Sequence, residues 1–120
     1  MERDYNLLRR LVLSIERDPH GYAPHNIKID GYSDEEIGYH NYLLVDSELA
    51  VGVDATTLGS TSPEWRILHL TSAGHDFADA IRDEIRWKKA TSIVKDKAGS
   101  VSLDVLKQLL ISLLKNTLGL

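Results

Sequence analysis

The stretch SDEEIGYHNYLLVDS, residues 33–47, contains the clearest local structural signal in the chain. Ser33 stands three residues before Glu36, which is the spacing of a capping box. In that motif the serine hydroxyl accepts from the amide of the glutamate, and the glutamate carboxylate accepts from the amide of the serine. Acidic residues in the first turn also suit the positive end of the helix dipole. The sequence therefore predicts a helix from about residue 34 to residue 47.

This helix is expected to have a buried side and an outer side. His40 falls on the apolar side, where we interpret it as a core histidine satisfied by a neighbour rather than as a metal ligand. Asn41 falls on the outer side, where its amide could contact a base edge. The predicted buried residues are Ile37, His40, Leu43 and Leu44. The predicted outer residues are Gly38, Asn41, Tyr42 and Val45.

Upstream, apolar residues recur at helical spacing over about residues 3–17, which predicts an N-terminal helix. Asp4 is a suitable N-cap, and Asp18 followed by proline ends the helix, because proline disfavours helical geometry in the residue before it. Residues 27–29 alternate and predict a short strand ahead of a turn at Asp30 and Gly31.

Downstream, two stretches alternate between apolar and other residues, at 49–53 and 65–70. Such alternation predicts strands, with Leu68 and Leu70 on one side of the second. Residues 54–64, rich in Thr, Ser, Gly and Pro, predict a long loop. Strand, loop and strand make a β-hairpin, and directly after a helix its tip has the position of a wing.

The C-terminal part is expected to be helical. Thr71 or Ser72 caps a helix that continues past Trp87 to about residue 98, and Gly99 is a natural stop. A last helix begins at Ser100 or Ser102, and its apolar arc is wider than one contact with a small core requires. A second copy of the chain could cover this arc, or the helix could be the core of a monomer. The candidate dimer interface is Leu103, Leu106, Leu110, Leu113 and Leu114.

Together these elements predict an α+β, winged-helix-like fold in a single domain of residues 1–120. It has an N-terminal helix, a central capping-box helix, a β-hairpin wing and two C-terminal helices. We place the winged-helix core at residues 1–81 and a C-terminal helical extension at residues 82–120.

Residues 29–44, residues 70–82 and the leucine-rich end resemble, in the same order, an uncharacterised bacterial and prophage family, domain of unknown function 2513. The resemblance covers almost the whole chain. Its most specific parts are the Gly-Tyr-Ser capping box and the Leu-Thr-x-x-Gly-His segment. The resemblance implies a winged-helix-like fold of undefined function, with no catalytic residues to carry over.

Composition narrows the classes of function. The chain has 120 residues and no cysteine, which excludes disulfides, thiol nucleophiles and cysteine-type zinc sites and suits the cytoplasm. No apolar run approaches the ~18–20 residues of a membrane span. Residues 1–81 carry six basic and fourteen acidic residues, a net charge of −8, whereas residues 82–120 carry eight and four, a net charge of +4.

We expect no enzyme activity, no metal and no cofactor. The sequence has no Gly-x-Ser-x-Gly elbow and no glycine-rich phosphate loop. The acidic residues near Arg82 recur at helical spacing, which is typical of a surface salt-bridge face. None of the histidines stands at the i, i+4 spacing of a helical zinc site. They are His20, His25, His40, His69 and His75.

Winged-helix folds are associated with DNA, yet binding requires several basic residues near phosphates. The helix at 34–47 begins with three acidic residues and contains no Lys or Arg, and the wing has none apart from Arg66 at its base. We therefore expect an accessory or regulatory module that contacts a protein partner or itself as a homodimer. The alternative is a DNA-binding transcriptional regulator that uses the wing and the basic residues 82–97. The candidate nucleic-acid contacts are Asn41, Arg66, Arg82, Arg86, Lys88 and Lys89.

Overall fold

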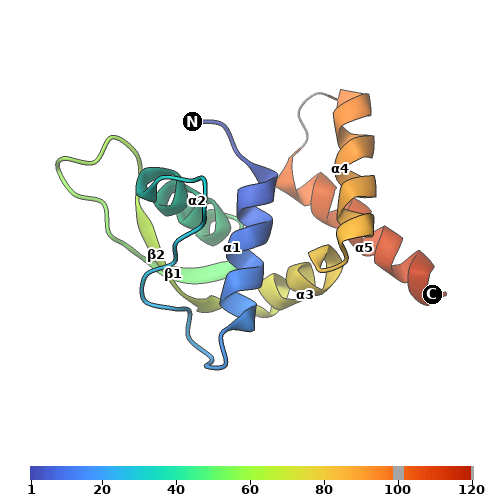
Figure 1. Ribbon diagram of the computed structural model, residues 1–120, viewed down its shortest axis with the longest axis horizontal. Helices are drawn as coiled ribbons and strands as arrows, with labels where there is room; N and C mark the ends of the chain where they lie inside the picture. The colour runs from blue at the N-terminus through green and yellow to red at the C-terminus, as the bar shows by residue number, and fades with distance from the viewer. Residues whose placement is uncertain (99–101, 120) are drawn as a thin grey trace. The chain divides into compact units, whose positions relative to one another are not determined.

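The computed structural model describes residues 1–98 and 102–119. Within them the chain is α+β, with five helices and a two-stranded antiparallel hairpin (Figure 1). It separates into two compact units, residues 1–75 and 76–120, with the boundary inside the third helix. The elements are α1 (Tyr5–Arg17), α2 (Asp34–Asp46), β1 (Ala50–Asp54), β2 (Trp65–Leu70), α3 (Ser72–Ile81), α4 (Glu84–Ala98) and α5 (Leu103–Leu118).

The first two helices begin where the sequence predicts. The Asp4 carboxylate accepts from the amide of Leu7, 3.1 Å away, and caps α1. Both halves of the capping box at α2 are formed: the Glu36 amide donates to the Ser33 hydroxyl at 3.1 Å, and the Ser33 amide donates to the Glu36 carboxylate at 2.9 Å. These bonds satisfy amides that a helix start otherwise leaves without partners.

His40 joins α2 to the beginning of α1. Its side chain is 1% exposed. Its Nε2 accepts from the Asp4 amide at 2.9 Å, and its Nδ1 lies 2.7 Å from the Glu36 carbonyl oxygen. A carbonyl only accepts and an amide only donates, so the ring is neutral with its proton on Nδ1. The prediction of a satisfied core histidine is confirmed.

The same capping carboxylate holds the turn before α2. The Tyr32 hydroxyl donates to Asp4 Oδ2 at 2.7 Å, and this hydrogen bond, together with burial, raises the pKa of Tyr32. Gly31 precedes it with a φ of 88°, a conformation that residues with a side chain rarely adopt. The predicted turn at this point is therefore present.

The hairpin contains a β-bulge that changes which residues are buried. Val51 pairs with His69 and Gly52 pairs with Ile67, so Leu68 has no opposite residue. An extra residue reverses the alternation along a strand. Ile67 and Leu70 are therefore both buried, whereas Leu68 is 37% exposed. The prediction that Leu68 and Leu70 share a side is wrong for this reason.

One side of α2 expected to face outward instead packs on the hairpin. The Nδ2 of Asn41 donates to the Trp65 carbonyl at 2.9 Å, and a Cβ placed on Gly52 would lie 3.0 Å from a methyl group of Val45. Gly38 and Asn41 are buried. The expected outer position of these two residues is wrong, because the hairpin covers a side of α2 next to the one that contacts α1. Leu43, expected to be buried, is half-buried.

Residues 27–29 do not form the predicted strand. Ile29 is buried and its carbonyl accepts from the Tyr32 amide, so it packs without pairing in a sheet. The segment meets β2 earlier, where the Ala23 amide donates to the Leu68 carbonyl at 2.7 Å. Alternation over three residues is too short to distinguish a strand from an extended segment.

The loop between the strands, residues 55–64, is called the wing below, and hydrogen bonds fasten it to itself and to α2. The Ser62 hydroxyl donates to the Glu35 carboxylate at 2.9 Å, and the Thr61 hydroxyl donates to the same oxygen. These two hydrogen bonds lower the pKa of Glu35. At the base of the wing, the Glu64 amide donates to the Thr56 hydroxyl at 3.0 Å.

The Leu-Thr-x-x-Gly-His segment is the junction between β2 and α3. The Thr71 amide donates to the Leu49 carbonyl at 3.0 Å, and the Thr71 hydroxyl accepts from the Gly74 amide at 3.0 Å. Thr71, rather than Ser72, therefore caps α3. A Cβ placed on Gly74 would lie 2.0 Å from the Leu49 carbonyl oxygen, so this position has no room for a side chain.

In the second unit, the helix predicted from about residue 71 to residue 98 is instead two helices. α3 ends at Ile81, and Asp83 caps α4 through a 2.8 Å hydrogen bond from the Arg86 amide. The Arg86 Nε donates to the Ala80 carbonyl at 3.1 Å and satisfies the end of α3. The prediction of one helix is wrong because Asp83, one of the acidic residues next to Arg82 that we interpret from their spacing as a surface salt-bridge face, is an N-cap.

The last helix begins after Ser102, whose hydroxyl accepts from the Val105 amide at 3.2 Å. The predicted stop at Gly99 and the alternative start at Ser100 lie outside the described residues. α5 contacts α4. None of the described helices is both long enough and apolar enough to span a lipid bilayer.

We predict that Gly74→Ala destabilises the protein although alanine is the better helix former. A methyl group would overlap the Leu49 carbonyl oxygen, and overpacking of this kind costs about 1–3 kcal/mol. Gly59→Ala is the matched control, because a Cβ there meets nothing within 4 Å. Urea unfolding followed by circular dichroism measures both variants. Equal unfolding midpoints for the two would contradict the close approach.

We also predict that Glu35 titrates below the ordinary range of a glutamate because of the wing. The hydrogen bonds to the Glu35 carboxylate stabilise the fold fully above the ordinary pKa of a glutamate. This stabilisation is lost as the pH falls through the lowered pKa of Glu35. The double variant Thr61→Val, Ser62→Ala should raise the pKa of Glu35 toward its ordinary value. Thr57→Val is the control, since the Thr57 hydroxyl contacts Ser60. Carboxyl ¹³C shifts recorded against pH measure the change, and an unaltered Glu35 titration in the double variant would refute it.

Candidate functional site

The first unit has two hollows that share Trp65. One, the wing groove, has a volume of about 500 Å³ and lies over the wing, with Tyr42 and Trp65 among its walls. The other, the inner pocket, has a volume of about 220 Å³ and is bounded by residues 24–28, by α2 and by residues 64–67. Both are candidate binding sites, because ligands and partner side chains bind preferentially in concave surfaces.

Two rings of an aromatic row, Tyr42 and Trp65, line the wing groove. The ring centroids of Tyr39 and Tyr42 are 5.8 Å apart, and those of Tyr42 and Trp65 are 6.1 Å apart. All three side chains are half-buried. The opposite wall is the Ser- and Thr-rich wing, with Asp54 at its base. Hydrogen bonds from Thr56 lower the pKa of Asp54. The groove therefore offers flat apolar area beside hydroxyl groups and a carboxylate.

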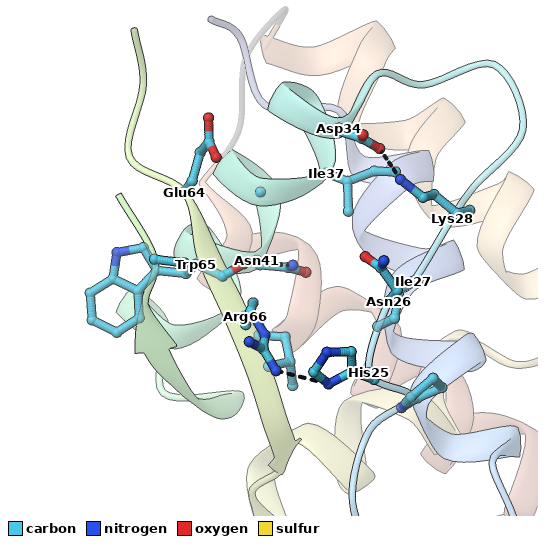
Figure 2. A pocket seen from close by; sticks show the side chains of 14 residues that line it. His25, Asn26, Ile27, Lys28, Asp34, Ile37, Asn41, Glu64, Trp65 and Arg66 are labelled. Carbon is cyan, nitrogen blue, oxygen red and sulfur yellow. Dashed lines mark hydrogen bonds and ion pairs between the residues drawn. The ribbon is translucent and has the colours of Figure 1, made fainter. Parts of the chain in front are cut away.

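The inner pocket is lined by both charged and apolar groups (Figure 2). At one end the Lys28 ammonium and the Asp34 carboxylate form an ion pair of 2.6 Å. At another, an Arg66 guanidinium nitrogen lies 3.0 Å from Nδ1 of His25. A guanidinium only donates, so His25 accepts through Nδ1. The charged and polar groups at each end of the pocket therefore already bond to each other in pairs.

Asn41 contributes an unsatisfied acceptor to the inner pocket. The residue is 6% exposed, and its Nδ2 donates to the Trp65 carbonyl. That carbonyl fixes the orientation of the amide, because only a donor can face it. Its Oδ1 is buried and, in the described part of the chain, has no hydrogen-bond partner. A buried acceptor without a donor costs about 1–3 kcal/mol, so this oxygen requires an explanation.

The residues predicted to contact nucleic acid are mostly engaged in local structure. Asn41 is buried, contrary to the expectation that it faces outward. Arg82 pairs with Asp79 at 3.0 Å, and Lys88 lies 3.4 Å from Glu84. Arg86 donates to the end of α3, as described above, whereas Arg66, Arg82, Lys88 and Lys89 are exposed. Asn41 and Arg66 were predicted as nucleic-acid contacts, but the pocket that they line was not predicted; the signal that could have suggested it is an Asn among small and apolar residues of α2.

The predicted dimer interface is largely core. Leu103, Leu106 and Leu110 are buried within the chain, whereas Leu113 and Leu114 are half-buried. The first three are therefore not available to a second copy in this structure. Over residues 1–98 and 102–119, no group of three His, Cys, Asp or Glu side chains is arranged to hold a metal ion.

Comparison with known proteins identifies a relative and a family model that each cover most of the chain. A protein from Haemophilus influenzae, titled "Uncharacterized protein", is 29% identical over 116 residues, which is 90% of this chain and 91% of the relative. The search of solved structures found no match to this chain. A family model described as "Hypothetical protein (DUF2513)" matches residues 2–100. The chain therefore belongs to the DUF2513 family, as its resemblance indicated.

Proposed function

We propose that this chain is a non-catalytic accessory or regulatory module, winged-helix-like and of bacterial or prophage type, that acts in the cytoplasm through protein–protein contacts. The surface we assign to those contacts is the wing groove. The observation that carries the proposal is the half-buried aromatic row of Tyr39, Tyr42 and Trp65, of which Tyr42 and Trp65 line the groove.

Aromatic side chains of this kind are well suited to protein recognition. Tyr and Trp provide a large contact area with few rotatable bonds, and they are enriched among the residues that contribute most to interface affinity. Tyr42 and Trp65 pack on each other, so binding a partner would require little additional ordering of either ring. The serine and threonine hydroxyls opposite them supply the polar rim that such interfaces contain.

The wing is already ordered by hydrogen bonds before any partner arrives. Thr61 and Ser62 both donate to Glu35, and Thr56 joins the two ends of the wing. A loop held in this way loses less conformational entropy on binding than a free one. This preorganisation favours a surface that receives a partner rather than one that folds around it.

The outer side of α2 favours a protein partner over DNA. Helical spacing places Glu35, Tyr39, Tyr42 and Asp46 together on one side of α2, where Glu35 contacts the wing and Tyr42 contacts Trp65. Two carboxylates on this side would repel the phosphates that a groove-bound helix must approach. The described wing residues add no Lys or Arg. The basic residues of α4 support the alternative of a DNA-binding regulator less well, since Arg82 and Lys88 already pair with acidic neighbours.

We predict that Tyr42→Ala and Trp65→Ala weaken partner binding by about tenfold or more, as truncation of an aromatic anchor does. A photo-crosslinking amino acid at position 61 in the native host identifies the partner, and calorimetry measures its affinity for each variant. Tyr22→Ala is the control, because Tyr22 is a 71% exposed tyrosine that contacts His69 and does not line the groove.

Folding of each variant is checked by circular dichroism, so that loss of binding is not confused with loss of structure. An equal loss of affinity in Tyr22→Ala would show that general surface aromaticity, rather than the groove, is responsible. Retention of full affinity by both groove variants would rule out the wing groove as the contact surface.

A second copy of the chain is the other partner that we expect, through α5. Leu118 is 63% exposed, and it stands one turn after the half-buried Leu114. We predict a dimer by light scattering that Leu118→Glu converts to a monomer of unchanged stability. Leu110→Glu should instead unfold the chain, because Leu110 is fully buried. A parent protein that stays monomeric at every concentration tested would remove the dimer from the proposal.

A further inference from the structure

We infer that the inner pocket binds a small carboxylate with a neighbouring N–H donor, of the kind present in an amino acid or at the C-terminus of a chain. This inference goes beyond the proposed function, because the inner pocket and the wing groove are separate hollows that meet at Trp65. It rests on two groups that line the pocket and lack a matching partner.

The first group is the Oδ1 atom of Asn41, which requires a donor. Figure 2 shows the Asn41 amide directed toward the space between β2 and residues 25–28. The Nδ2 atom of this amide donates to the Trp65 carbonyl, so Oδ1 is the atom left for a ligand in the pocket. Asn41 is only 6% exposed, and its Oδ1 atom has no hydrogen-bond partner in the described residues. An N–H or O–H group from a ligand would satisfy it.

The second group is the guanidinium of Arg66, which has no anionic partner among the contacts described here and could bind one. Its contact in this structure is the neutral acceptor nitrogen of His25, at 3.0 Å. A planar guanidinium binds a carboxylate through two parallel hydrogen bonds, which are stronger than one bond to a neutral ring. A carboxylate that enters the pocket would therefore displace His25 from Arg66.

The other charged groups of the pocket do not compete for this ligand. Lys28 and Asp34 neutralise each other across 2.6 Å. Figure 2 shows the Glu64 carboxylate directed away from both Asn41 and Arg66. Ile27, Ile37 and Ile67 supply the apolar part of the wall. The pocket thus presents one acceptor and one cation, which match a donor and an anion on the same small molecule.

Entry of the ligand requires little of the fold to change. Residues 24–28 form the outer wall, and two exposed side-chain contacts, Lys28 with Asp34 and His25 with Arg66, fasten this segment to α2 and β2. Exposed contacts of this type contribute little to stability. The segment has neither helix nor strand structure that an outward movement would break.

The test is a titration of the full-length ¹⁵N-labelled chain, followed by amide chemical shifts, with N-acetylglycine as the probe. A fragment of this size binds weakly, so the titration extends to about 50 mM. N-acetylsarcosine has the same carboxylate but no N–H, and it should bind about fivefold more weakly if Asn41 Oδ1 accepts that proton. Glycine carries an ammonium group instead of an amide, so its affinity relative to N-acetylglycine distinguishes a free amino acid from a chain end.

Two variants assign the anion contact. Arg66→Gln should weaken N-acetylglycine binding by about tenfold, because it replaces a charged donor pair with one neutral donor. Lys28 lines the same pocket, but its ammonium group is paired with Asp34. Lys28→Gln should therefore change the affinity for N-acetylglycine by less than about twofold. Arg66 is exposed, so its replacement leaves the fold intact.

The inference fails if no amide near Asn41 or Arg66 shifts at the highest concentration, which would mean that water alone occupies the pocket. It fails equally if N-acetylsarcosine and N-acetylglycine bind alike, or if Arg66→Gln binds as tightly as the parent chain. Loss of binding in Arg66→Gln with Tyr42→Ala unaffected would support the inner pocket independently of the wing groove.

Discussion

The hydrogen bond from the Asp4 amide to His40 is the contact on which the arrangement of the first unit depends. It connects the first residue before α1 to the middle of α2, and His40 can accept it only while its Nδ1 donates to Glu36. The Asp4 carboxylate then caps α1 and accepts from Tyr32, one residue before the Ser33 cap of α2. The starts of both helices are thus fixed by one residue. Each such bond is worth about 1 kcal/mol net, but an unpaired imidazole at this burial would cost more than its bonds gain.

With α1 and α2 fixed at this point, the hairpin has one way to complete the core. Gly38, Asn41 and Val45 form the side of α2 that receives it, and Gly52 permits β1 to approach, because a Cβ there would lie 2.6 Å from the Arg66 carbonyl oxygen. The bulge at Leu68 then turns both Ile67 and Leu70 inward. Two neighbouring sides of α2 are consequently buried, and the side that remains carries Glu35, Tyr39 and Tyr42, the last of which packs on Trp65 of β2.

Local signals in the sequence predicted the elements well, whereas tertiary contacts decided the sites. The caps at Asp4 and Ser33 and the stop at Asp18 involve residues three or fewer positions apart, so the sequence alone contains their geometry. The burial of Asn41 depends on its contact with Trp65, 24 residues later in the chain. The spacing of apolar residues within α2 contains no sign of this contact. The break at residues 82–83 was missed because an Asp within a charged helical pattern can be a surface residue or an N-cap, and only the chain around it decides. The pocket groups were missed for the same reason as Asn41, since they come together from three separate segments.

The location of Asn41 also links the fold to the choice between functions. In a helix that binds the DNA groove, a polar side chain of this kind must reach base edges, and basic side chains near it must contact the phosphates. Here the amide is directed into the protein, one end held by Trp65 and the other unsatisfied. The unpaired Oδ1 atom of Asn41 carries a desolvation penalty. An apolar atom at the same place would not carry that penalty. The donor end of this asparagine already serves the Trp65 carbonyl, and its acceptor end gains a hydrogen-bond partner when a donor enters the inner pocket.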